Sequence, residues 1–378
     1  MNQRLPLLLA VACVLGPLCL ALGVDSVARA QNSVAELISD RGAYLAQIAG
    51  CAACHSPAGG PLFSGNIVEW HGSSIHAPNL TPSASGLGNW TDEAIRAAIT
   101  QGIVPNGRQL HPVMPYLYYN GMADTDVDAL INYLRSLEPV ETPAESANDL
   151  SRVTLPPTPP PRSGIVSPHP ADEIAYGEYL VEAVMACGSC HTPTLDNGEP
   201  DPALHLAGGT AFSGEWGTVY ASNLTPQTTS GLGRLSDEAV ILAIVAGRHP
   251  DRRPIYAMPW QAYSILSGQD VQAIVTYLRS VDPILNDVPP AQLNAGYERY
   301  ATSDSSPSVA GVALTVIMAV LMGGLLAYLI VRQYRYMQRI RETDWEEHFR
   351  AVVSEIRTSK GQSGLQTRDR HRSNGPGR

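Results

Sequence analysis

Two short patterns in this chain could do chemistry, and both are pairs of cysteines followed by a histidine. Residues 51–55 read CAACH and residues 187–191 read CGSCH. Two thiols three positions apart on one helical turn can reach both vinyl groups of a haem, while the adjacent histidine reaches the iron. Covalent c-type haem is therefore predicted at each pattern. The predicted attachment residues are Cys51, Cys54, Cys187 and Cys190, and the predicted iron ligands are His55 and His191.

Two other chemistries also use paired cysteines. A zinc ribbon does not require a histidine directly after each second cysteine. A thioredoxin-type redox pair needs a βαβ context, and 30 prolines and 33 glycines among 378 residues indicate short helices and long loops instead. Haem attachment is the interpretation that both patterns favour.

The second axial ligand of each iron must come from well downstream of the cysteines. Met114 follows His55 by 59 residues and Met258 follows His191 by 67 residues, and each methionine stands before a proline. The histidines in these stretches do not occupy matching positions, so they are expected on the surface or beside the haem propionates. Thioether ligation by Met114 and Met258 is therefore predicted.

Two arginines precede these methionines at the same spacing. Arg108 and Arg252 each stand six residues before the methionine of their segment. A guanidinium forms a forked pair with a carboxylate, so both are candidates for contact with a haem propionate. Ordinary surface charge is the open alternative for both.

Both patterns belong to an internal repeat. The segment NLTP occurs at residues 79–82 and again at residues 223–226. If residues 63–65 (FSG) are matched to residues 212–214 (FSG), the second copy carries a 13-residue insertion after its CxxCH. The repeat predicts two tandem helical domains at residues 31–140 and 171–290, joined by a Pro-rich linker at residues 141–170.

Helix-capping signals recur at matching places in the two copies. Thr91 and Ser236 each precede Asp-Glu and an apolar stripe, which predicts an N-cap at both positions. The last helix of the first copy is expected to begin at a capping box formed by Thr125 and Asp128.

The two ends of the chain carry membrane-related patterns. Residues 1–30 combine Arg4, an apolar stretch and a small-residue cleavage pattern, which predicts a secretory signal peptide. Residues 308–331 contain no charge and are long enough to span a bilayer. The basic tail at residues 332–378 would then lie in the cytoplasm, with the haem domains on the periplasmic side of the bacterial cytoplasmic membrane.

Charge restricts the partners. The formal net charge is −10, and residues 31–331 alone carry 12 basic and 28 acidic residues. Such a surface repels nucleic acid phosphates and attracts protein partners with basic or neutral docking faces.

With these motifs, the sequence resembles class I cytochromes c, and more closely the multihaem cytochrome c subunits of bacterial membrane-bound alcohol, gluconate and related sugar dehydrogenases. The resemblance rests on the two CxxCH sites, the NLTP segments, residues 88–102 (GNWTDEAIRAAITQG) and residues 131–140 (INYLRSLEPV). It implies His/Met haems in small helical domains. It also implies first helices, through Gly42 and Tyr44 or Gly177 and Tyr179, that pack against Tyr133 or Tyr277. Such subunits usually hold three haems, whereas this chain has two CxxCH patterns.

The predicted fold class is mainly α: two tandem class I cytochrome c domains followed by one C-terminal transmembrane helix. The predicted function is one-electron transfer by an anchored protein with two haem c groups, a carrier rather than an enzyme. Its partners would be a dehydrogenase, an oxidase, or a photosynthetic donor or acceptor. The alternatives are a dihaem peroxidase, which needs an open iron position, and the c-type subunit of a terminal oxidase complex.

Overall fold

The computed structural model describes residues 40–70, 72–143, 147–250, 253–297, 349–351 and 353–354. The predicted signal peptide, the predicted transmembrane segment, most of the basic tail and Arg252 lie outside these residues. Among the helices that are described, none combines the length and the apolar character needed to cross a membrane.

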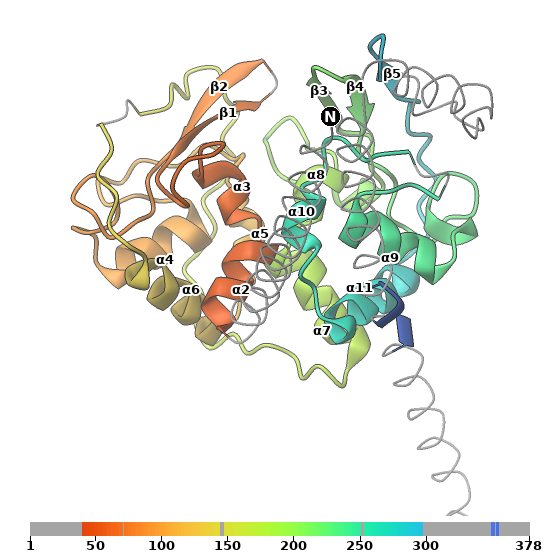
Figure 1. The fold of residues 1–378 in the computed structure, drawn as a ribbon, viewed down its shortest axis with the longest axis horizontal. Helices are drawn as coiled ribbons and strands as arrows, with labels where there is room; N and C mark the ends of the chain where they lie inside the picture. Colours follow the sequence, from red (N-terminus) through yellow and green to blue (C-terminus); the bar gives the residue numbers. More distant parts are fainter. Residues whose placement is uncertain are drawn as a thin grey trace, which may run out of the picture.

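The described chain is mainly helical, as expected, and forms two halves that lie side by side (Figure 1). The N-terminal half is residues 40–143 and the C-terminal half is residues 172–297. The N-terminal half contains α2 (Arg41–Ile48), α3 (Cys51–His55), β1 (Asn66–Trp70), β2 (Ser73–Ala77), α4 (Asp92–Gln101), α5 (Tyr116–Tyr119) and α6 (Asp124–Ser136).

The C-terminal half repeats this order with additions. It contains α7 (Glu173–Glu178), the π-helix η1 (Tyr179–Val184), α8 (Gly188–His191), the 3₁₀ turn η2 (Pro202–Leu204), β3 (Ala211–Gly214), β4 (Gly217–Tyr220), the 3₁₀ turn η3 (Leu232–Arg234), α9 (Asp237–Ala246), α10 (Trp260–Tyr263), α11 (Gly268–Ser280) and β5 (Gln292–Leu293). The π-helix has no counterpart in the N-terminal half. It accommodates one extra residue, because Gly42 precedes Cys51 by nine positions and Gly177 precedes Cys187 by ten.

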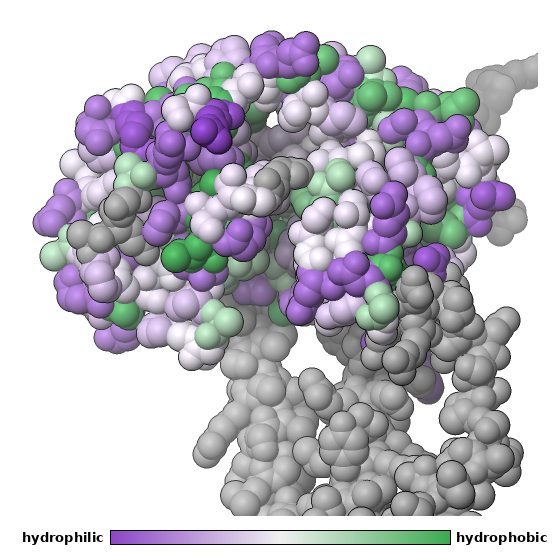
Figure 2. Space-filling model, turned by 90° about the horizontal axis from the view of Figure 1, so that it is seen from above, coloured by the Kyte–Doolittle hydropathy of each residue, from purple (hydrophilic) through white to green (hydrophobic). Residues whose placement is uncertain are grey.

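Each half also carries a small antiparallel sheet that the sequence patterns did not predict. Strand β1 pairs with β2 in the register Asn66↔Ala77, and β3 pairs with β4 in the register Ala211↔Tyr220. The two hairpins lie on the same side of the molecule in Figure 1, and the rings of Trp70 and Phe212 meet edge to face with centroids 5.6 Å apart. Hydrophilic residues cover most of that side, with hydrophobic residues in scattered groups (Figure 2).

The first and last helices of each half cross at a glycine. A Cβ atom on Gly42 would overlap the carbonyl oxygen of Ala129 in α6, and it would lie 2.7 Å from the Cβ of Tyr133. Gly177 in α7 meets Ala273 and the Cβ of Tyr277 in α11 in the same way, at 2.8 Å from the latter. The expected packing of these two glycines is therefore confirmed, and only a residue without a side chain permits it.

The predicted N-caps differ in outcome. Thr91 and Ser236 accept hydrogen bonds from the backbone N–H groups three residues later, at 3.2 Å and 3.3 Å, as expected. The predicted capping box at Thr125 and Asp128 does not form. Helix α6 begins at Asp124 instead, and the carboxylate of Asp128 pairs with Arg96 of α4.

Backbone hydrogen bonds show that one expected match within the repeat is wrong. Phe63 donates its N–H to Ser56 Oγ at 2.9 Å across seven positions, and Leu206 donates to Thr192 Oγ1 at 2.9 Å across 14. Both residues have a positive φ, 59° and 55°. The counterpart of Phe63 is therefore Leu206 rather than Phe212, and the insertion here is seven residues rather than 13. The second FSG segment, at residues 212–214, lies in β3, whereas the first, at residues 63–65, precedes β1.

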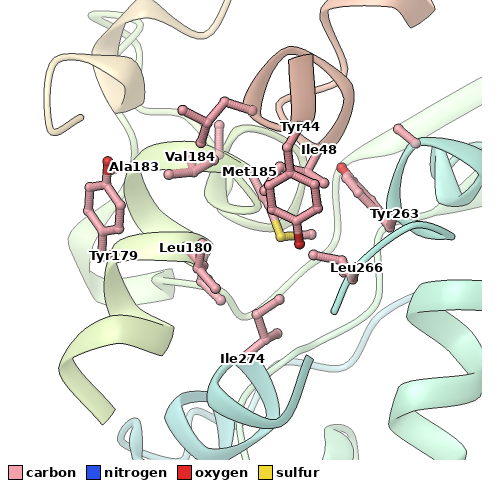
Figure 3. Packing of buried hydrophobic residues seen from close by; sticks show 14 of the residues in the cluster. Tyr44, Ile48, Tyr179, Leu180, Ala183, Val184, Met185, Tyr263, Leu266 and Ile274 are labelled. Carbon is pink, nitrogen blue, oxygen red and sulfur yellow. The ribbon is translucent and has the colours of Figure 1, made fainter. Parts of the chain in front are cut away.

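The core is continuous across the two halves. In Figure 3, Tyr44 and Ile48 of α2 lie among Met185, Tyr263 and Leu266 of the C-terminal half. All five side chains are buried. The short segment that begins at Phe349 also packs against this core.

Two hydrogen-bonded contacts cross the boundary in a reciprocal way. The hydroxyl of Tyr44 donates to Asp270, and the N–H of Ser267 donates to that hydroxyl at 3.2 Å. The hydroxyl of Tyr179 donates to Asp126 at 2.6 Å and accepts from the N–H of Ala123 at 3.1 Å. The tyrosine hydroxyls thus reach the last helix of the opposite half, a contact that the expected packing on Tyr133 or Tyr277 did not include.

The segment between the halves is extended and is held along the N-terminal half. Residues 155–169 contain no helix or strand. The amide of Gln109 donates to Pro156 O at 2.9 Å, the amide of Asn120 donates to Pro160 O at 3.1 Å, and Asp124 N donates to Ile165 O at 3.0 Å. These bonds give the linker a defined path.

Candidate functional site

Both CxxCH patterns form short helices, as the spacing requires if two thiols are to share a face: Cys51 and Cys54 lie in α3, while Cys187 is the N-cap residue of α8 and Cys190 lies within it. All four cysteines are partly exposed thiols. Desolvation by the surrounding chain raises the pKa of Cys51 to about 12 and also raises the pKa of Cys187. A thioredoxin-type nucleophile needs a lowered thiol pKa, so these thiols do not have that character.

Zinc binding is the other chemistry that paired cysteines allow. A structural zinc site gathers four cysteine or histidine donors at one point. Within the ranges that the structure covers, no group of three or more histidine, cysteine, aspartate or glutamate side chains could hold a metal ion.

The histidine of each pattern is oriented by a backbone carbonyl. His55 Nδ1 lies 2.7 Å from Pro78 O, and His191 Nδ1 lies 2.7 Å from Ser222 O. A carbonyl oxygen can only accept, so Nδ1 carries the proton and Nε2 keeps a free lone pair for a metal. Burial lowers the pKa of both histidines, which favours the neutral, ligating form.

The NLTP segments hold these two carbonyls in place. Asn79, which follows Pro78, accepts from the N–H and the hydroxyl of Thr81 at 2.8 Å and 2.7 Å, and its amide donates to Val140 O at 2.7 Å. Asn223 forms the same bonds with Thr225 and with Ile284 O. Sequence analysis did not identify Pro78 and Ser222, because they act through their main-chain carbonyls. The repeated NLTP segment that follows each of them was the signal that could have located them.

The two methionines occupy equivalent loops. Met114 and Met258 are partly buried against the core, and the carbonyl of each accepts from the N–H two residues later at 2.8 Å. The aromatic residue at that position lies on a glycine with positive φ. A Cβ on Gly102 would lie 2.5 Å from the ring of Tyr116, and Gly247 faces the ring of Trp260 closely. These contacts fix both methionine loops, while ligation of iron by the sulfur atoms stays a prediction.

Of the two arginines predicted to contact haem propionates, Arg108 lies among the described residues and Arg252 does not. Arg108 has a buried guanidinium nitrogen without a hydrogen-bond partner in the described chain, which suits an anionic group such as a carboxylate. Its backbone carbonyl accepts from Val104 N at 3.0 Å, and in the C-terminal half the carbonyl of Arg253 accepts from His249 N at 2.9 Å. Arg253, rather than Arg252, is therefore the residue that matches Arg108.

Two tyrosines of α5 lie near both CxxCH motifs. The ring of Tyr118 in α5 lies so close to Gly188 that a Cβ there would be 2.6 Å from the ring. Tyr119, whose hydroxyl donates to Ala49 O at 2.7 Å, is buried. Burial raises its pKa, and thiols of both cysteine pairs add to the rise. Residues of the N-terminal half thus touch the second motif directly.

This donor set fits haem c: paired thiols for attachment, a neutral imidazole with Nε2 free, and a buried cationic donor without a partner. The geometry defines a c-type haem protein.

Comparison with known proteins narrows the class of protein further. The cytochrome c family profile matches residues 39–138. The chain is 34% identical over 261 residues to the fructose dehydrogenase cytochrome subunit of Gluconobacter japonicus, with 64% of this chain and 52% of that protein covered. It is 32% identical to the gluconate 2-dehydrogenase cytochrome c subunit of Pantoea cypripedii, with 70% and 64% covered.

A further relative is covered over two thirds of its own length. The chain is 32% identical over 203 residues to a dihaem cytochrome c-type protein of Cereibacter sphaeroides, with 50% of this chain and 67% of that protein covered. This chain belongs to the cytochrome c family, as the match over two thirds of that dihaem cytochrome shows. Its resemblance to dehydrogenase cytochrome subunits is confirmed. Membership indicates covalently bound haem c. The chain spans about half to two thirds of the length of the dehydrogenase subunits that it matches.

Proposed function

We propose that this chain is a membrane-anchored cytochrome with two haem c groups, which carries single electrons between redox partners outside the cytoplasm. The carrying observation is the repeated histidine geometry, because both CxxCH histidines donate Nδ1–H to a main-chain carbonyl at 2.7 Å. Haem c supplies reversible one-electron oxidation and reduction when bound. The chain attaches it through Cys51, Cys54, Cys187 and Cys190, ligates iron through His55, His191, Met114 and Met258, and offers Arg108 to a propionate.

The number of haems is tested by mass. Each CxxCH forms its own pair of thioether bonds, so the intact mature protein should carry two haem increments that survive extraction with acidified organic solvent. Replacing Cys187 and Cys190 with alanine should remove one increment and leave the other. A wild-type mass with one increment, or with none, would contradict the proposal.

The proposed complex is a membrane-bound dehydrogenase in which this chain accepts electrons from the catalytic subunit. Support comes from relatives named as cytochrome subunits of fructose, alcohol and gluconate dehydrogenases. The acidic body, with 12 basic against 28 acidic residues at 31–331, should dock on basic or neutral partner faces and bind less tightly as salt increases. Co-purification from detergent-solubilised membranes identifies the partner.

A dihaem peroxidase is the competing function, and it requires an iron with an open or displaceable position. The matched Met114 and Met258 loops argue for six-coordinate, low-spin iron at both sites. The ferric spectrum distinguishes the two functions, because a peroxidase in its active form contains a high-spin haem.

A further inference from the structure

The two haem motifs are matched in shape but differ in charge at one place. Counted forward from Gly177, which matches Gly42, the counterpart of Glu182 is Gln47; counted back from Cys187 across the extra residue of η1 it is Ala46, and neither residue is ionisable. Because Leu206 matches Phe63, the counterpart of His205 is Leu62. The C-terminal half therefore holds an ionisable pair where the N-terminal half has an amide and an exposed leucine.

In the structure Glu182 and His205 are bonded to each other. His205 Nε2 lies 3.0 Å from Glu182 Oε1, and the hydroxyl of Tyr277 donates to the same oxygen at 2.9 Å. The Glu182 side chain is 24% exposed and that of His205 is 40% exposed. A carboxylate in this half-buried position is screened by water less than a surface charge is.

The pair lies beside the second attachment motif. Glu182 belongs to η1. The residue before it, Val181, accepts a hydrogen bond at its carbonyl from the N–H of Cys187, at 2.9 Å. Its charge acts on the thiol of Cys187 and on the hydroxyl of Tyr118, the ring that lies on Gly188. An electrostatic change at Glu182 therefore reaches the haem that this motif would hold.

The groups that face the pair come from every neighbouring element. Tyr277 of α11 and Tyr118 of α5 stay protonated, because burial, with the charge of Glu182 second, raises their pKa values. Glu178 of α7 adds a second negative charge near His205. The hydrogen bond to Glu182 raises the pKa of His205 above its usual value.

We propose that Glu182 and His205 form a pH-dependent charge pair that sets the reduction potential of the haem at Cys187–His191. This inference rests on the proposed function, since it requires a haem at the second motif. With His205 protonated the pair is neutral. With His205 neutral it carries one negative charge, which stabilises ferric over ferrous iron and lowers the potential. The potential of the second haem thus falls as pH rises through the titration of His205, and the first haem has no such pair.

Spectroelectrochemical titration of the full chain in detergent, at steps across about pH 5 to 8, tests this. Wild type should show one potential that falls with pH and one that follows this trend weakly. Glu182→Gln should raise the falling potential at the alkaline end. His205→Gln should hold that potential at its low value throughout, since the carboxylate then stays unpaired.

The repeat supplies a matched control. The double variant Gln47→Glu with Leu62→His transplants the pair into the N-terminal half, and it should make the other potential lower and pH-dependent. Unchanged low-spin spectra establish that each variant is correctly folded. Two attached haems with potentials that do not move in Glu182→Gln and His205→Gln would overturn the inference alone, whereas absence of the second haem would overturn the proposed function.

Discussion

At the scale of single residues, the two proposed methionine ligands differ from every other methionine of the described chain in where they lie. Met122, for example, is fully buried in the apolar core. Met114 and Met258 stand in loops built from a proline, an aromatic ring and a left-handed glycine. Because these contacts fix the loop around the methionine, they also fix the direction of its thioether sulfur, and a metal ligand needs such a fixed direction.

Replacing either loop methionine with alanine should therefore convert one haem to a high-spin or exogenously ligated form, while covalent attachment is retained. The near-infrared sulfur-to-iron band of the ferric protein should lose about half its intensity in each single variant, since each site contributes one thioether. Met122→Leu serves as the control and should keep the full band. Full band intensity in Met114→Ala or Met258→Ala would show that the ligand is another residue.

At the scale of elements, the sequence predicted what depends on local pattern. The CxxCH helices and the N-caps at Thr91 and Ser236 follow from short-range chemistry, and each is present. The glycine crossings at Gly42 and Gly177 are also present, but they were expected from the family resemblance rather than from local pattern. The capping box at Thr125 did not form because α6 already begins at Asp124, with Ala123 as its N-cap, so Thr125 lies inside the helix and Asp128 pairs with Arg96 of α4.

Other features depend on the three-dimensional fold, which residue types alone do not specify. The match of Phe63 to Phe212 relied on identical residue types. The two halves instead share a hydrogen-bonded turn, which Phe63 forms in the N-terminal half and Leu206 forms in the C-terminal half. The role of Pro78 and Ser222 lies in their carbonyl groups, which are invisible to residue type. The destination of the Tyr44 and Tyr179 hydroxyls depends on how the halves meet, which no periodicity within one half specifies.

The reciprocal tyrosine contacts make a prediction about stability. Tyr44→Phe and Tyr179→Phe each remove a hydrogen bond to a buried carboxylate, so each should lower the free energy of unfolding by about 1.5–3 kcal/mol. The loss should be smaller for Tyr179→Phe, because Asp126 keeps two bonds from Arg41, at 2.9 Å and 2.5 Å. Denaturant titration of the haem-loaded protein measures both, with Tyr220→Phe in β4 as the control. Equal stability of all three variants would show that these contacts do not hold the halves together.

At the scale of the whole molecule, the proposed function depends on membrane topology. In the proposed arrangement residues 31 to about 307 are exported, residues 308–331 stop transfer, and residues 332–378 stay inside. The structure places Phe349 against the hydrophobic core. Both cannot hold at once, since a bilayer would separate Phe349 from the haem domains.

Truncation before Ser308 should release a red, soluble protein with two haems that still exchanges electrons. Protease added to intact spheroplasts should digest the haem domains and spare an epitope placed near Arg378. Cleavage of that epitope would instead put the tail on the same side as the haem domains, in agreement with the Phe349 contact, and the proposed topology would then be wrong.

The paired contacts between Tyr44 and Asp270 and between Tyr179 and Asp126 relate the two halves by an approximate twofold symmetry, because each half offers the other the same tyrosine and the same aspartate. A perfectly symmetric arrangement would give the two proposed haems the same surroundings and the same potential. The side chains outside this shared interface break the symmetry, since Glu182 and His205 stand where the N-terminal half has Gln47 and Leu62. A preferred direction of electron flow between the halves would therefore come from these side chains rather than from the interface itself.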